Sequence, residues 1–314
     1  MSGPKAPSLI DMKSKRVIIT GATSGLGKES AIALAKLGAE IVLAVRDTNR
    51  GEVVKNQILN LTPGAKIEVS KLDLMDLDSV RSFASSQSSR PIDILLNNAG
   101  IMAVPFERSK DGFESQMATN HLGHFLLTKL LFEAIEKGTN PRIINVASGG
   151  HRLGKLKNGD AKELNVDEPS YSPWTVYGNT KLVNLLFTRE LARRLKLINS
   201  NIITAVAHPG YANTNLQFVA ATKKSGKLKA VELQVTKVMN MILGQSAANG
   251  ALPQIAACTW VDTSSGDYFG PRGLLELRGE PKKVGMNKLA RDNNLAQRVW
   301  RTSEELLGVT FLHG

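Results

Sequence analysis

Short apolar runs alternate with longer segments of helical periodicity over the first two thirds of the chain. The apolar runs span residues 16–20, 40–45, 66–72, 92–98, 142–148 and 201–206. The helical segments span residues 26–37, 48–60, 77–87, 113–136 and 172–196. The apolar runs are continuous, which is typical of strands covered on both faces. Strand–helix alternation therefore predicts an α/β fold with a doubly wound parallel sheet of the Rossmann type.

No linker, repeat or low-complexity segment divides the 314 residues. We therefore predict a single domain over residues 1–314, with a cofactor half at about 14–150 and a catalytic and substrate half at about 151–314. A hydrophobic content of 42% suits one large core. The single cysteine, Cys258, excludes an internal disulfide and is expected to be a small core residue in a reducing compartment.

The N-terminal stretch MSGPKAPSLIDMKSKR lacks the apolar segment of a signal peptide. Along the chain, no apolar run reaches the length of about 18 residues that predicts a membrane-spanning helix. These features predict a cytoplasmic protein.

The net charge of +12 would suit nucleic acid, an anionic membrane surface or a phosphorylated cofactor. Basic residues are spread along the chain, and no basic stripe is interleaved with aromatic residues, which disfavours nucleic acid. The exception is KKSGKLK at 223–229. This basic segment is either a solvated loop or a contact with anionic membrane surfaces.

A glycine-rich stretch, TGATSGLGKES, joins the first predicted strand to the first predicted helix. Gly21, Gly25 and Gly27 give a G-x-x-x-G-x-G spacing, and no G-K-[ST] ends it, which excludes a P-loop. Glycines let the backbone approach a pyrophosphate, which binds at the positive end of the helix dipole. The loop therefore predicts a dinucleotide site.

The second predicted strand ends in LAVRD, where such folds select the cofactor. An acidic residue there binds the 2′-hydroxyl of NAD, whereas an arginine accommodates the 2′-phosphate of NADP. Val45 is apolar and Arg46 follows it, with a guanidinium that matches phosphate geometry. Asp47 lies one residue further, and Arg50 is either a second contact or a solvated charge. We therefore expect NADP(H), with Arg46 on its phosphate.

Tyr177 and Lys181 occur in YGNTK, within the helix predicted for residues 172–196. Their spacing places both side chains on one face of a helix. Ordinary pKa values of about 10 and 10.4 make each a poor acid–base catalyst near neutrality, but a nearby ammonium favours the phenolate. Gly178 costs this helix about 1 kcal/mol relative to alanine, which a close neighbour beside Tyr177 would explain.

Four motifs stand in the order found in the short-chain dehydrogenase/reductase family. They are TGATSGLG (20–27), NNAG (97–100), YGNTK (177–181) and HPG (208–210). The chain resembles this family over residues 16–215. Residues 111–131 and 265–271 are most similar to the retinol dehydrogenase branch, which is related to light-dependent protochlorophyllide reductases. The resemblance implies a sheet of seven strands, with DYF (267–269) in the last.

The resemblance also implies roles for individual residues. The catalytic tetrad would be Asn120, Ser148, Tyr177 and Lys181. Ser148 would bind the substrate oxygen, Tyr177 would exchange its proton, and Lys181 would lower the pKa of Tyr177 and bind the nicotinamide ribose. The cofactor residues would be Gly21, Thr23, Ser24, Gly25, Leu26, Gly27, Arg46, Asp73, Leu74, Asn98, Ala99, Gly100, Tyr177, Lys181, Pro209, Gly210 and Thr214. Asp73 would lie near the adenine ring.

Several alternatives stay open. His121 and His124 have a spacing that suits a metal, but no third ligand is evident, so no metal site is expected. An apolar stripe within 228–242 is either ordinary core or a cover for a lipophilic substrate. The chain is then an NADPH-dependent reductase of lipophilic aldehydes or ketones, a light-driven reductase of a tetrapyrrole, or a non-catalytic NADPH-binding regulator. The family often assembles through its Tyr-Lys helix, so a homo-oligomer is expected.

Overall fold

The computed structural model describes residues 8–211 and 245–313. Thr214, the basic segment 223–229 and the apolar stripe within 228–242 lie outside the described residues, so the expectations placed on them stay predictions.

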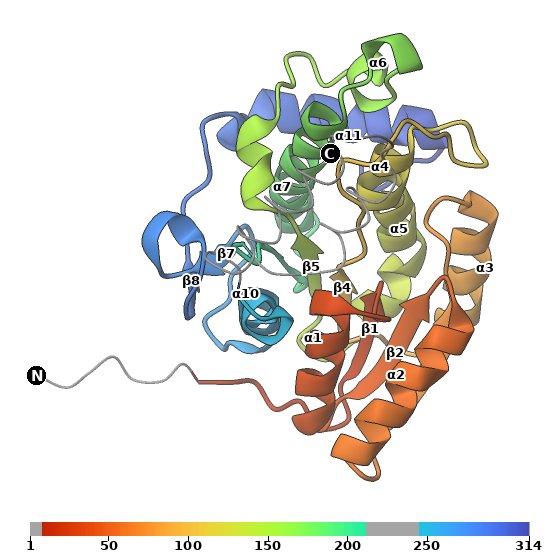
Figure 1. Ribbon diagram of the computed structural model, residues 1–314, viewed down its shortest axis with the longest axis vertical. Coiled ribbons are helices and arrows are strands. Elements are labelled where there is room, and N and C mark those ends of the chain that lie inside the picture. The colour runs from red at the N-terminus through yellow and green to blue at the C-terminus, as the bar shows by residue number, and fades with distance from the viewer. Residues whose placement is uncertain (1–7, 212–244, 314) are drawn as a thin grey trace, which may run out of the picture.

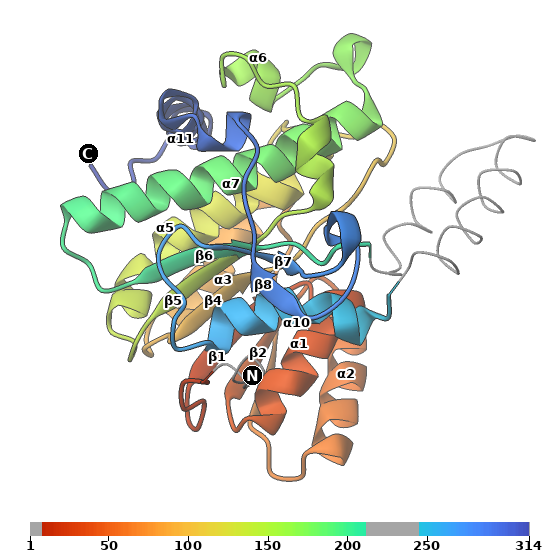
Figure 2. The same ribbon diagram turned by 90° about the vertical axis from the view of Figure 1, so that its left-hand side faces the viewer.

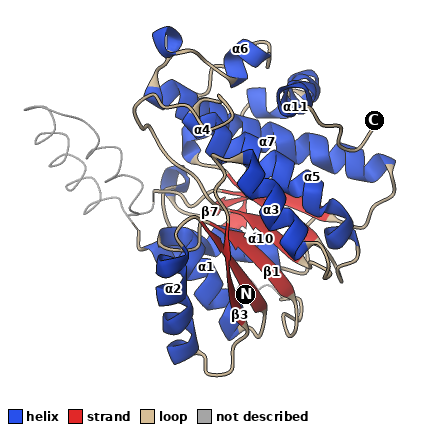
Figure 3. Ribbon diagram, turned by 90° about the vertical axis from the view of Figure 1, so that its right-hand side faces the viewer, coloured by secondary structure: helices blue, strands red, loops and turns tan. Residues whose placement is uncertain are grey.

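A single twisted sheet runs through the described part of the chain (Figures 1 and 3). Its strands are β1 (Arg16–Thr20), β2 (Glu40–Val45), β3 (Ile67–Lys71), β4 (Ile94–Asn97), β5 (Arg142–Val146), β6 (Ile203–Ala207), β7 (Tyr268–Pro271) and β8 (Pro281–Lys283). The strand order is β3-β2-β1-β4-β5-β6-β7-β8, and every pair except β7–β8 is parallel. The predicted doubly wound sheet is confirmed.

The strand β8 was not predicted. It is three residues long, reads PKK and pairs antiparallel with β7. A charged segment of that length carries no hydrophobic pattern, so only the tertiary pairing reveals it.

Helices cover both faces of the sheet (Figure 2). One face carries α1 (Gly25–Lys36), α2 (Thr48–Leu61) and α10 (Ala247–Thr259), and the other carries α3 (Leu77–Gln87), α5 (Gly123–Glu136) and α7 (Pro173–Leu197). Side chains of a strand alternate between the two faces. Accordingly Val17 and Ile19 belong to the core cluster under α1, whereas Ile18 belongs to the cluster under α5.

The helix predicted for residues 113–136 is interrupted. It begins as α4 (Ser115–Met117), passes through a π-helical turn at Ala118–Leu122 and continues as α5. Such a turn inserts one residue into the helix and often marks a functional site. Gly123 follows the turn, and a Cβ there would lie 2.8 Å from the carbonyl oxygen of Leu74. The helix therefore passes very close to the loop that follows β3.

A final helix, α11 (Asn293–Leu307), lies on the outer side of α7 (Figures 1 and 2). Trp300 stacks on Phe187 with ring centroids 5.5 Å apart, and the guanidinium of Arg194 lies 4.6 Å from the centroid of Trp300. Residues 176–188 of α7 are all buried. A homo-oligomer formed through the middle of this helix would therefore have to displace α11.

Candidate active site

A groove opens at the carboxyl ends of β1 and β4. At this point of the sheet, β2 and β3 follow on one side of β1, and β4 and β5 follow on the other. Ligands of open α/β sheets bind at this kind of switch point. The groove encloses about 270 Å³. It is lined by all twelve of the following predicted residues: Gly21, Thr23, Ser24, Gly25, Leu26, Gly27, Arg46, Asp73, Leu74, Asn98, Ala99 and Gly100.

The glycine loop is shaped for close backbone approach. Gly21 has φ +69°, and a Cβ there would lie 2.8 Å from the Cα of Ala99. At Gly27 a Cβ would lie 2.5 Å from Nδ2 of Asn98. Ser24 begins α1 without a side-chain cap, and the first turn of the helix carries no acidic residue. The loop and helix terminus therefore fit a dinucleotide pyrophosphate.

Arg46, Asp47 and Arg50 all line the outer end of this groove. Asp47 caps α2, because its Oδ1 accepts a hydrogen bond of 3.1 Å from the backbone N–H of Arg50. That carboxylate therefore has a structural role at the helix terminus. Arg46 and Arg50 supply two guanidinium groups at this end of the groove.

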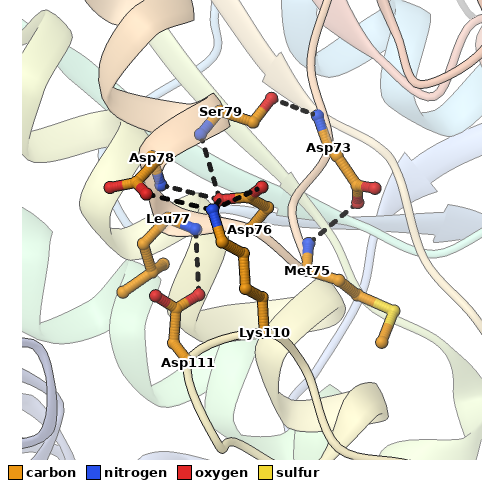
Figure 4. Close-up of polar contacts among 8 residues, drawn as sticks. All are labelled: Asp73, Met75, Asp76, Leu77, Asp78, Ser79, Lys110 and Asp111. Carbon is orange, nitrogen blue, oxygen red and sulfur yellow. Dashed lines mark hydrogen bonds and ion pairs between the residues drawn. The ribbon is translucent and has the colours of Figure 1, made fainter.

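The loop that carries Asp73 is braced from two sides (Figure 4). The backbone N–H of Met75 donates to Oδ1 of Asp73 at 3.0 Å. Asp76 caps α3 and also pairs with Lys110 at 3.2 Å. Asp111 accepts a 3.0 Å bond from the backbone N–H of Leu77. These contacts tie residues 110–111 to the wall of the groove that Asp73 forms.

Asn120 and Lys181 meet at the inner end of the groove. The side chain of Asn120 holds the backbone of Ile101, accepting at 2.8 Å and donating at 2.9 Å, and also donates to Thr180. A Cβ at Gly100 would lie 3.2 Å from Oδ1 of Asn120 and 3.3 Å from Nζ of Lys181. Gly100 lines the groove, and both polar groups lie directly behind it without lining the groove themselves.

Tyr177 and Ser148 complete the group. Tyr177 is 6% exposed, and the ammonium of Lys181 lies over its ring, 5.7 Å from the centroid. A Cβ at Gly150 would lie 2.9 Å from the Tyr177 ring, so this position requires a glycine. Gly178 is explained as well, because its Cβ would lie 2.8 Å from the backbone nitrogen of Gly154. The four residues predicted as a tetrad thus lie together.

Burial acts against the predicted effect of Lys181 on the pKa of Tyr177. Burial raises the pKa of Tyr177, opposed by a hydrogen bond with Ser148. Burial also lowers the pKa of Lys181, to about 8. The ammonium of Lys181 donates to the carbonyl oxygen of Val146 at 3.2 Å and faces the ring rather than the phenol oxygen. Desolvation of both groups therefore outweighs their mutual effect.

A second cavity of about 720 Å³ lies beside Ser148. Gly210 lines it, whereas Pro209 does not line either cavity. Its outer wall is the turn that contains Leu275 and Glu276, at φ +53° and +57°. The Glu276 carboxylate accepts hydrogen bonds from Nε2 of His208 at 3.1 Å and from Arg152 at 3.2 Å. These bonds lower the pKa of Glu276 to about 2.

Among the described residues, no group of three or more His, Cys, Asp or Glu side chains could hold a metal ion. His208 lines the second cavity, and Nδ1 of His151 lies 2.7 Å from the carbonyl oxygen of Ser148.

Sequence reasoning missed several residues of the two cavities. In the first cavity Thr119 is the clearest case, because its buried Oγ1 has no hydrogen-bond partner within the described residues. Its position next to Asn120 was the available signal. In the second cavity the missed residues are Arg152, Glu276 and Lys282. They belong to no motif, and because they are distant in the chain, the sequence does not indicate that they lie close together.

Comparison with known proteins is consistent with this geometry. Residues 15–157 match the family described as short chain dehydrogenase. Human retinol dehydrogenase 12 is 35% identical over 304 residues, which cover 96% of this chain and 88% of that protein. A crystal structure of an uncharacterised Mycobacterium paratuberculosis protein has 38% identity and a TM-score of 0.78, covering 96% of this chain and 97% of that one.

A more distant structure shows the fold alone. It is a short chain dehydrogenase/reductase from Burkholderia phymatum in complex with NAD, with 18% identity, a TM-score of 0.63 and coverage of 97% of this chain and 99% of that one. None of the helices in the described ranges has the length and apolarity needed to cross a membrane.

Proposed function

Because this chain belongs to the short-chain dehydrogenase/reductase family of oxidoreductases, we propose that it is an NADP(H)-dependent reductase of lipophilic aldehydes or ketones. The observation that carries the proposal is the inner end of the groove. There, Gly100 brings the backbone within reach of both Lys181 and Asn120, and Tyr177 lies directly beyond the ammonium. A cofactor in the groove would therefore present its reactive end to a proton donor.

The chemistry needs one hydride and one proton. A bound nicotinamide nucleotide supplies the hydride to the carbonyl carbon. The Ser148 hydroxyl donates to the carbonyl oxygen as negative charge develops there. Tyr177 then gives its phenolic proton to the same oxygen. Burial raises the pKa of Tyr177, so the donation of its proton depends on stabilisation of the phenolate that remains.

Lys181 has two roles in this scheme. With a pKa of about 8, it is mostly an ammonium at neutral pH. That positive charge stabilises the phenolate left on Tyr177 after the proton has moved. The same ammonium, next to Gly100, is placed to bind the ribose of the cofactor.

The preference for NADP(H) is supported by the outer end of the groove. Arg46 and Arg50 both line it, and each supplies donors suited to a phosphate. Oδ1 of Asp47 is already engaged by the backbone N–H of Arg50 as the cap of α2.

A lipophilic substrate is supported by the sequence similarity to a retinol dehydrogenase and by the cavity beside Ser148. The relative of 35% identity is named a retinol dehydrogenase, and a cavity of about 720 Å³ suits a bulky molecule. Leu275, which lines the cavity, is 74% exposed.

Purified protein assayed with NADPH or NADH against a panel of retinal, alkyl aldehydes and ketones tests the proposal. We expect reduction in the dark, faster with NADPH, and unchanged by light. Turnover of a tetrapyrrole that depends on light would contradict it. Tight NADPH binding without turnover of any carbonyl would favour the regulator.

A further inference from the structure

His121 and His124 form a natural matched pair that the proposed reaction does not use. Both are buried, at 1% and 3% exposure, on consecutive turns of the helix that carries Asn120. Burial lowers the pKa of each imidazole to about 3. Both rings are therefore neutral at pH 7, and the difference between them lies in what they contact.

His121 faces the C-terminal helix. Its Nε2 lies 2.8 Å from the hydroxyl of Ser303 on α11. Its ring packs edge-on against Phe125 and Phe187, with centroids 5.9 Å and 5.7 Å away. These contacts join α11 to the core, and none of them reaches the groove.

His124 faces the opposite way, toward the sheet. Its Nδ1 lies 3.3 Å from the backbone carbonyl oxygen of Asn120, and its Nε2 lies 2.8 Å from Oγ1 of Thr20. A carbonyl oxygen cannot donate, so Nδ1 must carry the proton of the neutral ring. Nε2 is then an acceptor, and the hydroxyl of Thr20 donates to it. The network thus assigns a single tautomer.

Thr20 extends this connection to the floor of the groove. Its Oγ1 accepts hydrogen bonds of 2.9 Å from the backbone N–H groups of both Asn98 and Ala99. Those two residues line the groove beside Gly21. The hydroxyl of Thr20 therefore has two donors on one side. On the other side its nearer acceptor is Nε2 of His124 at 2.8 Å, and the carbonyl oxygen of Leu96 lies further away at 3.5 Å.

We propose that His124 is a positioning residue that couples the cofactor floor to Asn120. One end of the ring orients the hydroxyl that holds Asn98 and Ala99, and the other end holds the carbonyl of the π-helical turn. Asn120 in turn holds Ile101 and lies beside Lys181. This inference rests on the proposed function, because it assigns His124 to the same cofactor and proton-transfer site.

Substitutions that keep one end of the ring separate the two connections. In His124→Gln, the amide oxygen can reach the position of Nε2 and accept from Thr20. In His124→Asn, the shorter amide can donate to the Asn120 carbonyl, as Nδ1 does. His124→Leu removes both hydrogen bonds of the ring. His121→Leu is the matched control, because it makes the same substitution at an equally buried histidine one turn away. NADPH affinity is measured by fluorescence titration, turnover by steady-state kinetics and stability by thermal unfolding.

We expect His124→Leu to weaken NADPH binding about 5-fold, the effect of losing one neutral hydrogen bond. Turnover at saturating NADPH should fall about 10- to 100-fold, since small misplacements near reacting groups have effects of this size. His124→Gln should restore NADPH affinity more than turnover, and His124→Asn should do the reverse. His121→Leu should lower the unfolding temperature comparably and leave both functional quantities within about twofold of wild type.

Two results would overturn the proposal. In the first, His124→Leu and His121→Leu affect affinity and turnover alike. In the second, the Asn and Gln variants restore both quantities to the same extent. If His124→Leu does not fold, the contrast between the Asn and Gln variants still decides. A folded wild type that binds neither NADPH nor NADH would instead refute the proposed function itself.

Discussion

The groove and the cavity beside Ser148 are built in different ways. The groove is shaped by backbone: glycines at close approach, a helix terminus and the ends of parallel strands. The cavity is shaped by side chains from segments far apart in the sequence, with Arg152, His208 and Glu276 meeting at its outer wall. A backbone site serves a cofactor of constant shape, whereas a side-chain wall can be altered without disturbing the sheet.

This difference has an energetic side. Leu275 and Glu276 both adopt left-handed backbone conformations, which cost about 1–3 kcal/mol each for non-glycine residues. The bonds of Glu276 to His208 and Arg152, and a 2.8 Å backbone bond from Tyr211 to Leu277, hold the turn in place. The outer wall of this cavity therefore depends on a few polar contacts between segments that are distant in the chain.

The largest effect is expected at Lys181, which lies beside Gly100 of the groove and over the ring of Tyr177. Lys181→Met should lower turnover by about 10²–10⁴ and also weaken NADPH binding. Because the folded pKa of about 8 lies below the unfolded value of about 10.5, the buried charge destabilises the fold at pH 7. The variant should thus be at least as stable as wild type at pH 7, and this advantage should shrink between pH 8 and 10.5.

Denaturant unfolding at pH 7 and pH 10, beside steady-state kinetics, measures both predictions for Lys181→Met. Loss of turnover with unchanged NADPH affinity would show that Lys181 acts in proton transfer and does not bind the cofactor.

The next effect is confined to the groove. Arg46→Ala removes one charge-assisted contact, so NADPH binding should weaken by about 1.5–3 kcal/mol. NADH lacks the 2′-phosphate, and its affinity should barely change. Titration of both cofactors against wild type and variant gives the answer, with Arg50→Ala as the neighbouring arginine on the same rim. Equal weakening of NADPH and NADH would show that Arg46 does not read the phosphate.

The smallest effect is confined to the cavity. Glu276→Gln should raise the KM for carbonyl substrates about 3- to 10-fold, because the strained turn loosens, and leave cofactor affinity unchanged. The folded pKa of Glu276 lies below its unfolded value, so its ionised form stabilises the fold above about pH 4.5. Partial exposure limits that contribution to about 1–2 kcal/mol.

The stability difference between Glu276→Gln and wild type should therefore be present at pH 7 and shrink as the pH falls from about 4.5 toward 2. Glu280→Gln, at an exposed carboxylate nearby, is the control. A change in NADPH affinity in Glu276→Gln would mean that the two regions are not separable.

The same contrast explains what the sequence could predict. The sheet, the glycine loop and the groove depend on apolar runs and glycine spacing, which local sequence records. The break at Ala118–Leu122 and the strand β8 depend on tertiary packing and were not visible. Burial, which no local pattern reports, raises the pKa of Tyr177 and was not included in the expectation for this residue. Glu276 was missed because its partners, Arg152 and His208, are distant in the chain.

The most direct test of the central claim is the phenol of Tyr177. Tyr177→Phe keeps the ring that packs on Gly150 and beneath Lys181 and removes only the hydroxyl. NADPH titration and carbonyl reduction are measured on the same preparation of wild type and variant. We predict unchanged NADPH affinity with reduction slower by about 10²–10⁴. A Tyr177→Phe enzyme that reduces an established carbonyl substrate at nearly the wild-type rate would contradict the account.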